Sequence, residues 1–328
     1  MVTMRIISVD ELGRLFASLQ GKPRVVVSGN VAVPWPAVRI LDANKDEYTI
    51  HALNAPPGIP DREGVTAETC FVGAGMRRHS NLSYVPSRLS LVPVLLQRRI
   101  PADVVIIHCA PPRDGQLSLG IEVNILPAAI EGCRMRSGRV VAVINDQMPY
   151  TYGDALVPVE WVDVAIEVSE PLPAHDPATP DDDSRAIGER VASRVSDGST
   201  LQMGIGGVPD ATLNALTGRR GLRIWTEMFS DGMVPLVEGG VITNRAKAVH
   251  PGRSVTSFVM GTRRLYDFID DNPAVEFHGC DRTNDTALIR KNPKVTAINS
   301  ALAIDLSGQV CADSLGHTIY SGIGGQMD

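Results

Sequence analysis

The chain has 328 residues, 44% of them hydrophobic and 21% charged, and a formal net charge of −6. This length and apolar content allow a buried core and favour two domains rather than one. The mildly acidic balance gives no basic footprint for nucleic acid and no attraction to anionic membranes, so we expect neither as a partner.

The first residues of the chain and the spacing of its cysteines indicate in which cellular compartment the protein is expected. Residues 1–16 lack a charged start followed by a long apolar stretch, so no secretory signal is predicted, and the longest apolar runs are too short to span a bilayer. The five cysteines are widely spaced, without a Cys-x-x-Cys pair, which favours free thiols in a reducing environment. We therefore expect a cytoplasmic protein.

Short runs of apolar and β-branched residues alternate with helix-like segments along the chain. The runs that predict strands are Arg24–Ser28, Asp103–Cys109, Val140–Asn145, Val162–Val168, Leu222–Trp225 and Val295–Asn299. Several are apolar almost throughout, which is typical of parallel strands covered on both faces. Helices are predicted between them, for example over Tyr84–Arg99 and Leu126–Met135. The pattern predicts an α/β fold.

The clearest break in this alternation is residues 169–183, where four prolines rule out regular structure. We interpret this segment as a linker between an N-terminal domain, residues 1–168, and a C-terminal catalytic domain, residues 184–328. The acidic run Asp181–Asp183 is expected to cap a helix that follows at once. That helix is predicted by apolar residues spaced by four and a terminating glycine: Ile187, Val191, Val195 and Gly198.

A short strand then runs into a glycine-rich loop, in the segment Leu201–Asp210 (LQMGIGGVPD). Glycines permit positive φ and close approach of a ligand, and Pro209 suits the first turn of a helix. The successive N–H groups predict a site for a phosphate or an oxyanion, although a plain strand-to-helix turn would also explain the segment. The candidate donors are Gly204, Ile205, Gly206, Gly207 and Val208.

Glu227 is the candidate nucleophile, because it follows an apolar strand and precedes a Ser-Asp-Gly turn. Ligands bind at the carboxyl ends of strands in α/β sheets. Its neighbours Trp225, Met228 and Phe229 would partly desolvate the carboxylate, which raises its pKa and removes hydration that weakens a nucleophile. A surface or ion-paired glutamate is the alternative interpretation.

Another glycine cluster, Tyr320–Gln326, repeats the Gly-Ile-Gly-Gly of the first, so two loops can approach one site. Its candidate site residues are Gly322, Ile323, Gly324 and Gly325. A rival interpretation takes the first loop as a dinucleotide fingerprint with Glu227 on the ribose, but Pro209 stands where the third glycine belongs. The seven histidines form no pair at zinc-ligand spacing, so no metal site is predicted.

Four segments in this order resemble the acetyl-CoA hydrolase/transferase family, which includes acetate, succinate, propionate and 4-hydroxybutyrate CoA-transferases. They are Leu201–Asp210 (LQMGIGGVPD), Thr226–Gly232 (TEMFSDG), Ile298–Asp305 (INSALAID) and Tyr320–Gln326 (YSGIGGQ). Similar motifs in the N-terminal half, including Phe71-Val72-Gly73 and Pro111-Pro112-Arg113-Asp114-Gly115, extend the likeness to nearly the whole chain.

The resemblance implies two similar, open, mostly parallel α/β domains with the active site between them. It implies that Glu227 is the nucleophile, that Gly204–Val208 supply main-chain donors and that Gly322–Gly325 line the acyl and CoA site. The implied substrates are an acyl-CoA thioester and a small carboxylic acid, with no tightly bound cofactor, and we expect a homo-oligomer such as a dimer.

The expected reaction is transfer of CoA between carboxylic acids through a glutamyl anhydride and a glutamyl-CoA thioester. An acyl-CoA hydrolase with the same nucleophile and a non-catalytic CoA-binding module are the alternatives. Two features depart from the family. Trp225 stands where relatives often carry histidine, which predicts a different acyl pocket, and the sequence stops at Asp328 where the family's domain continues. The second domain is thus expected to be truncated, with apolar surface exposed at that end.

Overall fold

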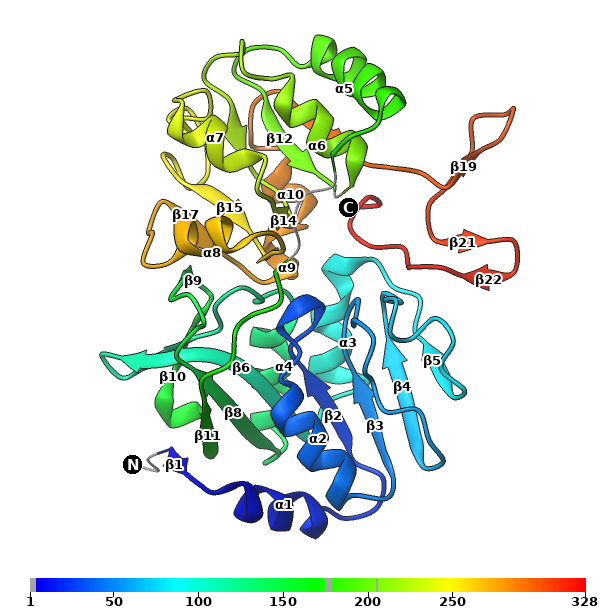
Figure 1. The fold of residues 1–328 in the computed structure, drawn as a ribbon, viewed down its shortest axis with the longest axis vertical. Coiled ribbons are helices and arrows are strands. Elements are labelled where there is room, and N and C mark those ends of the chain that lie inside the picture. Colours follow the sequence, from blue (N-terminus) through cyan, green and yellow to red (C-terminus); the bar gives the residue numbers. More distant parts are fainter. Residues whose placement is uncertain (1–3, 175–178, 205) are drawn as a thin grey trace.

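The computed structural model describes residues 4–174, 179–204 and 206–328. Figure 1 shows two α/β halves stacked along the long axis of the molecule, with the C-terminal end of the chain between them. None of the helices in these three ranges is long and apolar enough to cross a membrane.

The N-terminal half is built on a ten-stranded sheet, whose main path has the order β1-β11-β8-β6-β2-β3-β4-β5 and is parallel throughout. The bounds are β1 Arg5–Ile6, β2 Arg24–Val27, β3 Tyr48–His51, β4 Val65–Thr69, β5 Leu82–Tyr84, β6 Val104–Arg113, β8 Arg139–Asn145 and β11 Val164–Val168. Two short strands, β7 (Gln116–Ser118) and β10 (Leu156–Pro158), add antiparallel pairs.

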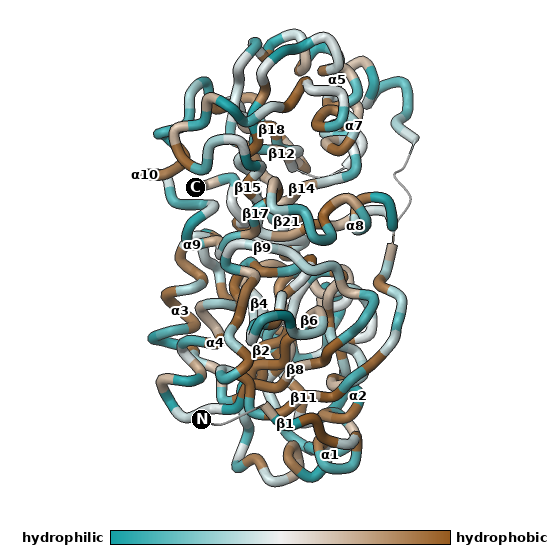
Figure 2. The backbone as a smooth tube through the Cα atoms, turned by 90° about the vertical axis from the view of Figure 1, so that its left-hand side faces the viewer, coloured by the Kyte–Doolittle hydropathy of each residue, from teal (hydrophilic) through white to brown (hydrophobic). Residues whose placement is uncertain are grey.

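Both faces of this sheet are covered, which explains the continuous apolar runs. In β2, Val25 and Val27 face a core shared with α1 (Val9–Ser18) and α2 (Trp35–Asn44), while Val26 faces the opposite core. That second core receives α3 (Val92–Arg98) and α4 (Leu126–Arg134). Figure 2 shows the hydrophobic strands β2 and β8 in the middle of this half. The predicted doubly covered parallel sheet is therefore confirmed.

Apart from its last part, the C-terminal half also pairs its strands in parallel, in three separate pieces of order β13-β12-β18, β14-β16 and β15-β17-β9. The last piece includes β9, a strand from the N-terminal half of the chain. The bounds are β9 Tyr152–Gly153, β12 Thr200–Met203, β13 Arg223–Ile224, β14 Met228–Phe229, β15 Ser254–Thr256, β16 Phe258–Val259, β17 Val275–Phe277 and β18 Val295–Ile298. The helices are α5 Asp182–Arg194, α6 Gly207–Asn214, α7 Met233–Glu238, α8 Arg263–Ile269, α9 Cys280–Thr283 and α10 Thr286–Ile289. The predicted mostly parallel α/β class holds for this half too.

Two predicted helices differ from the observed ones. Over Tyr84–Arg99, Tyr84 ends β5, and helix α3 starts only at Val92, because Pro86 breaks any helix before it and Pro93 suits a first turn. The helix after the linker is α5, and Asp181 caps it by accepting a hydrogen bond from Ser184 N at 2.7 Å, as predicted. However, α5 ends at Arg194 rather than near Gly198, since Val195 is already extended.

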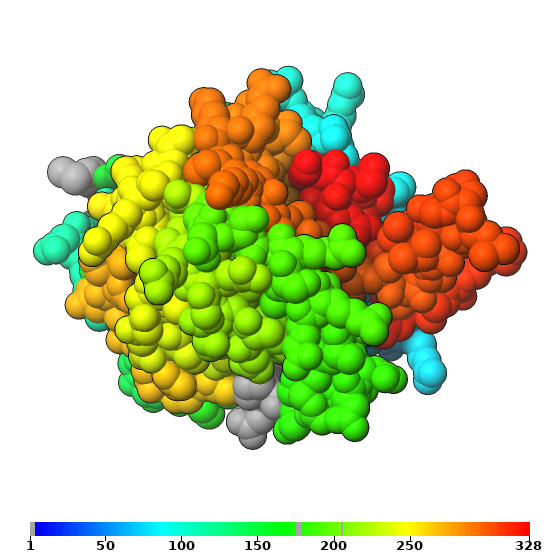
Figure 3. Space-filling model, turned by 90° about the horizontal axis from the view of Figure 1, so that it is seen from above, coloured from blue at the N-terminus to red at the C-terminus, as the bar shows by residue number. Residues whose placement is uncertain are grey.

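The last part of the chain forms an arm that projects from the side of the molecule, as Figure 1 and Figure 3 show. It consists of the antiparallel pairs β19 (Ala303–Ile304) with β20 (Val310–Cys311) and β21 (Ser314–Leu315) with β22 (Thr318–Ile319). Its exposed apolar side chains are Leu302, Ile304, Leu306, Val310 and Leu315. Apolar surface is thus exposed in this part of the chain.

Candidate active site

A cavity of about 380 Å³ lies where the N-terminal half, the C-terminal half and the C-terminal glycine loop meet. The three parts contribute, among others, Asn30, Asn54, Asn124, Met203, Glu227 and Gly325. Its wall therefore includes the nucleophile predicted from the sequence and side chains from regions of the chain that are far apart.

The backbone of Glu227 is fixed between β13 and β14. Its carbonyl oxygen accepts hydrogen bonds from Ser257 N at 2.7 Å, Phe258 N at 3.0 Å and Thr256 Oγ1 at 2.8 Å. Thr226 Oγ1, one residue earlier, accepts from Met203 N at 3.1 Å at the end of β12. These bonds fix the peptide on both sides, so the carboxyl group is presented to the cavity from a rigid strand end.

The carboxyl group of Glu227 is poorly solvated. Asn284 Nδ2 donates a hydrogen bond to Glu227 Oε1 at 2.7 Å. Desolvation raises the pKa of Glu227 to about 7, although the bond from Asn284 opposes the rise and the negative charge of Asp328 adds to it. A carboxylate of this kind keeps little of the hydration that blunts its attack, which suits nucleophilic catalysis.

The C-terminal glycine loop lies directly over Glu227. A Cβ atom on Gly325 would stand 1.3 Å from Glu227 Oε1 and 2.3 Å from Asn284 Nδ2, so only glycine fits there. The same loop docks on the N-terminal half, where Leu89 N donates to Gly324 O at 3.1 Å. All four predicted residues of this loop, Gly322, Ile323, Gly324 and Gly325, line the cavity.

The first glycine loop is placed differently. Of its predicted residues, Gly204 lines the cavity, but its N–H donates to Ile298 O in β18 at 2.8 Å and is not free to bind an oxyanion. Ile205 lies outside the described residues. Gly206 has a φ of 113°, as a glycine loop predicts, and Gly207 opens α6 close to Ser184. Gly206, Gly207 and Val208 are absent from the described lining of the cavity.

Comparison with known proteins places this arrangement in a family. Residues 61–174 match the acetyl-CoA hydrolase/transferase N-terminal domain and residues 261–328 match the C-terminal domain. The 4-hydroxybutyrate coenzyme A transferase of Clostridium kluyveri is 38% identical over 325 residues, which are 95% of this chain and 75% of that protein. The chain belongs to the acetyl-CoA hydrolase/transferase family. The resemblance and the CoA-transferase class of enzyme inferred from the sequence are thereby confirmed.

Another relative and two solved structures are also similar to this chain. The succinyl-CoA:acetate/propanoyl-CoA:succinate CoA transferase of Fasciola hepatica is 38% identical and covers 95% of this chain and 68% of its own length. The crystal structure of a 4-hydroxybutyrate CoA-transferase from Porphyromonas gingivalis superposes with a TM-score of 0.81 at 32% identity, covering 93% of this chain and 75% of that one. RipA from Yersinia pestis superposes with a TM-score of 0.85 at 26% identity, covering 94% and 78%.

The sequence did not identify the residues that the N-terminal half contributes to the cavity. Asn30 and Asn54 follow the carboxyl ends of the adjacent parallel strands β2 and β3, and Asn124 follows β7 by a short loop. The sequence did contain a signal for Asn30 and Asn54, because a polar residue just after a buried parallel strand lies at the ligand-binding edge of the sheet. The pairing of β2 with β3 was not visible in the sequence.

Trp225, where the family often carries histidine, does not line the described cavity. Its indole Nε1 donates to Thr283 O at 2.7 Å, and its side chain is 3% exposed. The side chain of Trp225 therefore lies against α9 rather than in the described lining, and the prediction of an acyl pocket that differs from that of relatives stays a prediction. Trp225 packs beside His250, 6.0 Å between ring centroids.

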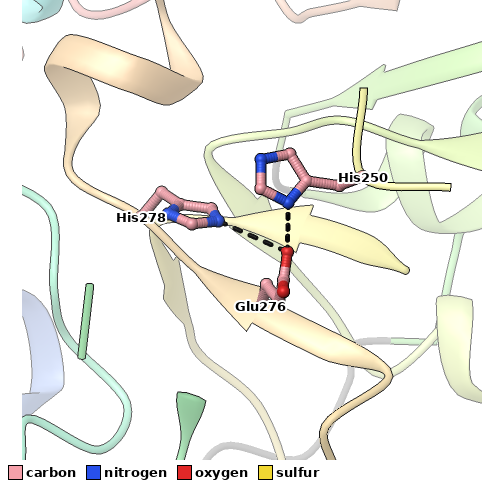
Figure 4. A group of neighbouring side chains, drawn as sticks. All are labelled: His250, Glu276 and His278. Atoms are coloured by element: carbon pink, nitrogen blue, oxygen red, sulfur yellow. Dashed lines mark ion pairs between the residues drawn. The ribbon is translucent and has the colours of Figure 1, made fainter. Parts of the chain in front are cut away.

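The side chains of His250, Glu276 and His278 converge on one another, as Figure 4 shows. Both histidine rings face one oxygen of Glu276, and Arg253 binds the other. Burial favours protonation of Glu276, but the hydrogen bond from Arg253 and the nearby histidines outweigh it and hold its pKa below its usual range.

These three side chains carry the donor atoms of a metal site, but arginine side chains already contact two of them, His250 and Glu276. Arg282 Nη2 lies 3.0 Å from His250 Nε2 and must donate to it, which leaves the ring proton on Nδ1 for Glu276. His278 Nδ1 pairs with Asp154 Oδ2 at 2.9 Å. We interpret the group as an ion-pair network that ties β17 to α9, the helix just before Asn284.

A pH prediction follows from the environment of Glu227. If the ionised carboxylate attacks the thioester, kcat/KM should fall as the pH drops through about 7 and level off above it. Asn284→Ala removes the bond that stabilises the carboxylate, so the pKa of Glu227 should rise and the midpoint of this profile should move to higher pH. Steady-state rates of acetyl-CoA turnover from pH 5.5 to about 9 measure both midpoints. An unchanged or lower midpoint in the variant contradicts this account of Glu227.

Proposed function

We propose that this enzyme is an acyl-CoA:carboxylate CoA-transferase with Glu227 as its covalent nucleophile. The observation that supports this assignment best is the environment of the Glu227 carboxyl group. It faces the cavity, is desolvated, and is held on one oxygen by Asn284 under the glycine at position 325. The family of the chain supports the reaction, and the geometry supports this residue.

The proposed reaction proceeds by exchange at the Glu227 carboxyl group. The carboxylate attacks the carbonyl carbon of acyl-CoA, the C–S bond breaks, and CoA leaves as the thiolate while a mixed anhydride forms. The thiolate then attacks the glutamyl carbonyl, releasing the first acid as a carboxylate and leaving a glutamyl-CoA thioester. An incoming carboxylate reverses the two steps and leaves as the new acyl-CoA. Atoms and charge balance at every step, so we propose that no tightly bound cofactor or metal takes part.

Each attack creates a tetrahedral oxyanion that needs hydrogen-bond donors. We propose that main-chain N–H groups of residues 206–208 donate to it when the substrate is bound, since the N–H of Gly204 is already used in the sheet. Loss of one such donor typically slows the chemical step by about 100- to 1000-fold. The opposite loop, Gly322–Gly325, is proposed to contact the acyl group and CoA.

The family name covers hydrolases as well, and water reaching the anhydride would convert transfer into hydrolysis. Incubation with acetyl-CoA, with and without a second carboxylic acid, separates the possibilities. A transferase forms a new acyl-CoA only with the acid, a hydrolase releases free CoA without it, and a non-catalytic CoA-binding module does neither. We expect the first result.

The covalent intermediate gives a direct prediction. Sodium borohydride added together with acetyl-CoA should inactivate the enzyme, because it reduces the glutamyl-CoA thioester at Glu227 to an alcohol. Borohydride alone should leave the activity intact, since a free carboxylate is not reduced. Peptide mass spectrometry should place the change on the peptide that contains Glu227. A modification at another residue, or inactivation without acyl-CoA, would reject the assignment.

We also propose that the protein is a cytoplasmic homo-oligomer. Its five cysteines are free thiols, as expected in a reducing compartment. The arm formed by β19–β22 exposes apolar side chains, including Ile304 and Leu306, which a second copy of the chain would cover. Sedimentation measurements at several protein concentrations test the oligomer, and a monomer throughout would reject it.

A further inference from the structure

The chain just after the C-terminal glycine loop is attached to the N-terminal half through the side chain of Asp328, which is only 1% exposed. Ser90 N donates to Asp328 Oδ2 at 3.2 Å, and Ser90 Oγ donates to Asp328 Oδ1 at 2.5 Å. Arg88 Nε lies 4.0 Å from the same Oδ1 atom. A buried carboxylate that is bonded at both oxygens is fixed in position, because leaving either oxygen without a donor is costly.

This contact fixes the part of the loop that covers the nucleophile. The backbone N–H of Asp328 donates to Gly325 O at 3.0 Å, and on the other side Leu89 N donates to Gly324 O at 3.1 Å. Both attachments of the loop are made to one short segment of the N-terminal half, the 3₁₀ helix η2 (Leu89–Leu91). Gly325 is therefore held between two anchors.

The helix η2 also contacts the element that carries the other neighbour of Glu227. Cys280 Sγ, at the start of α9, donates to Leu89 O at 3.3 Å. The residue directly after α9 is Asn284, whose amide binds the Glu227 carboxyl group. The glycine loop and Asn284 thus both depend on η2 for their position, so a displaced loop end would disturb the surroundings of the nucleophile.

Asp328 also brings a second negative charge close to Glu227. Desolvation is the main cause of the raised pKa of Glu227, and the charge of Asp328 adds to it. The thiol of Cys280 also lies near this carboxyl group, but burial raises the pKa of the thiol well above its usual range and keeps it neutral. Two cations lie further off: Arg77 in the described lining, and Arg88, which is 47% exposed and screened by water.

We propose that Asp328 is a positioning residue of the active site, which holds the glycine loop over Glu227 through its bonds to Ser90 and keeps a second negative charge beside the nucleophile. The proposal rests on the CoA-transferase function proposed above. Neither Asp328 nor Ser90 lines the described cavity, so the pair acts on the chemical step rather than on substrate binding. Acylation of Glu227 sends its negative charge away with the CoA thiolate, which relieves the repulsion from Asp328.

The test separates the two roles of Asp328 with two substitutions. Asp328→Ala should lower kcat for transfer from acetyl-CoA at least about tenfold with little change in KM, because the loop is no longer held over Glu227. Asp328→Asn keeps the shape of the side chain and can still pair with Ser90, so it should restore most of the lost kcat. Because this variant lacks the negative charge, the pKa of Glu227 should fall, and the midpoint of the kcat/KM profile should move to lower pH.

Asp61→Ala is the matched control, since Asp61 accepts hydrogen bonds from the N and Oγ atoms of Ser80, as Asp328 does from Ser90. Asp61 is 43% exposed and does not line the described cavity, so its variant should keep wild-type rates and the wild-type midpoint. Ser90→Ala is a second variant in case Asp328→Ala does not fold. It removes one bond but keeps the charge, so it should lower kcat and leave the midpoint in place.

Unchanged kcat in Asp328→Ala or, where that variant does not fold, in Ser90→Ala overturns the positioning role, and so does a higher KM with unchanged kcat. An unchanged midpoint in Asp328→Asn overturns the role of the charge. These results leave the CoA-transferase function standing, because transfer by the wild-type enzyme is measured in the same assay. If the wild type passes no CoA from acetyl-CoA to any added acid, the proposed function itself falls.

Discussion

Glu227→Gln is expected to reduce CoA transfer at least about 1000-fold, because an amide cannot form the anhydride and glutamine otherwise preserves the shape of the side chain. Steady-state transfer from acetyl-CoA to an added acid measures the loss. The matched control is Glu238→Gln, an exposed glutamate on α7 paired with Arg264, which should retain wild-type rates. If Glu227→Gln retains more than about a tenth of the wild-type activity, the anhydride mechanism is contradicted.

Thermal stability gives an independent check on the same variant. The pKa of Glu227 is raised to about 7 in the folded protein, so the native state holds its proton more tightly than the unfolded chain does. Stability from this group is present at low pH and is lost as the pH rises through about 7. Glutamine never ionises, so Glu227→Gln should melt at or above the wild-type temperature at about pH 8. A lower melting temperature would mean that the charged carboxylate stabilises the fold.

Gly325→Ala is expected to lower CoA transfer by about 100-fold or more, since displacement of catalytic groups by about 1 Å has effects of this size. The added Cβ would overlap Glu227 Oε1, at 1.3 Å, and crowd Asn284 Nδ2, at 2.3 Å. The loop must therefore move away from the carboxylate or push it aside. If the loop also excludes water, the fraction of acetyl-CoA lost to hydrolysis should rise.

Gly218→Ala is the matched control for that substitution. No atom lies within 4 Å of the Cβ it would add, and its φ is not positive, so its rates should equal those of the wild type. Parallel assays of new acyl-CoA and of free CoA separate transfer from hydrolysis. Full transfer activity in Gly325→Ala would show that the loop does not cover Glu227 in the working enzyme.

Local patterns in the sequence were sufficient to predict the class of fold. The run at Val104–Cys109 is buried at every position, and a strand that is apolar on both sides needs cover on both faces, which is the hallmark of a parallel α/β sheet. The cap at Asp181 was also predictable, since it depends on residues only three apart. The glycine repeat and Glu227 could also be predicted as parts of the candidate site. Each is recognised from a few adjacent residues in the sequence.

Only the tertiary structure decided how these pieces combine. Asn284 donates a hydrogen bond to Glu227, and Gly325 lies against both side chains, although the chain separates the three residues widely. No local periodicity encodes such a contact. The N–H of Gly204 was a reasonable oxyanion donor until β18 was seen to pair beside β12 and take that bond. Asn30 likewise gained its hydrogen-bond partner, Glu122, from a loop that the sheet brings close. Strand pairing is set by the burial of whole faces, a property of the assembled core that no single segment contains.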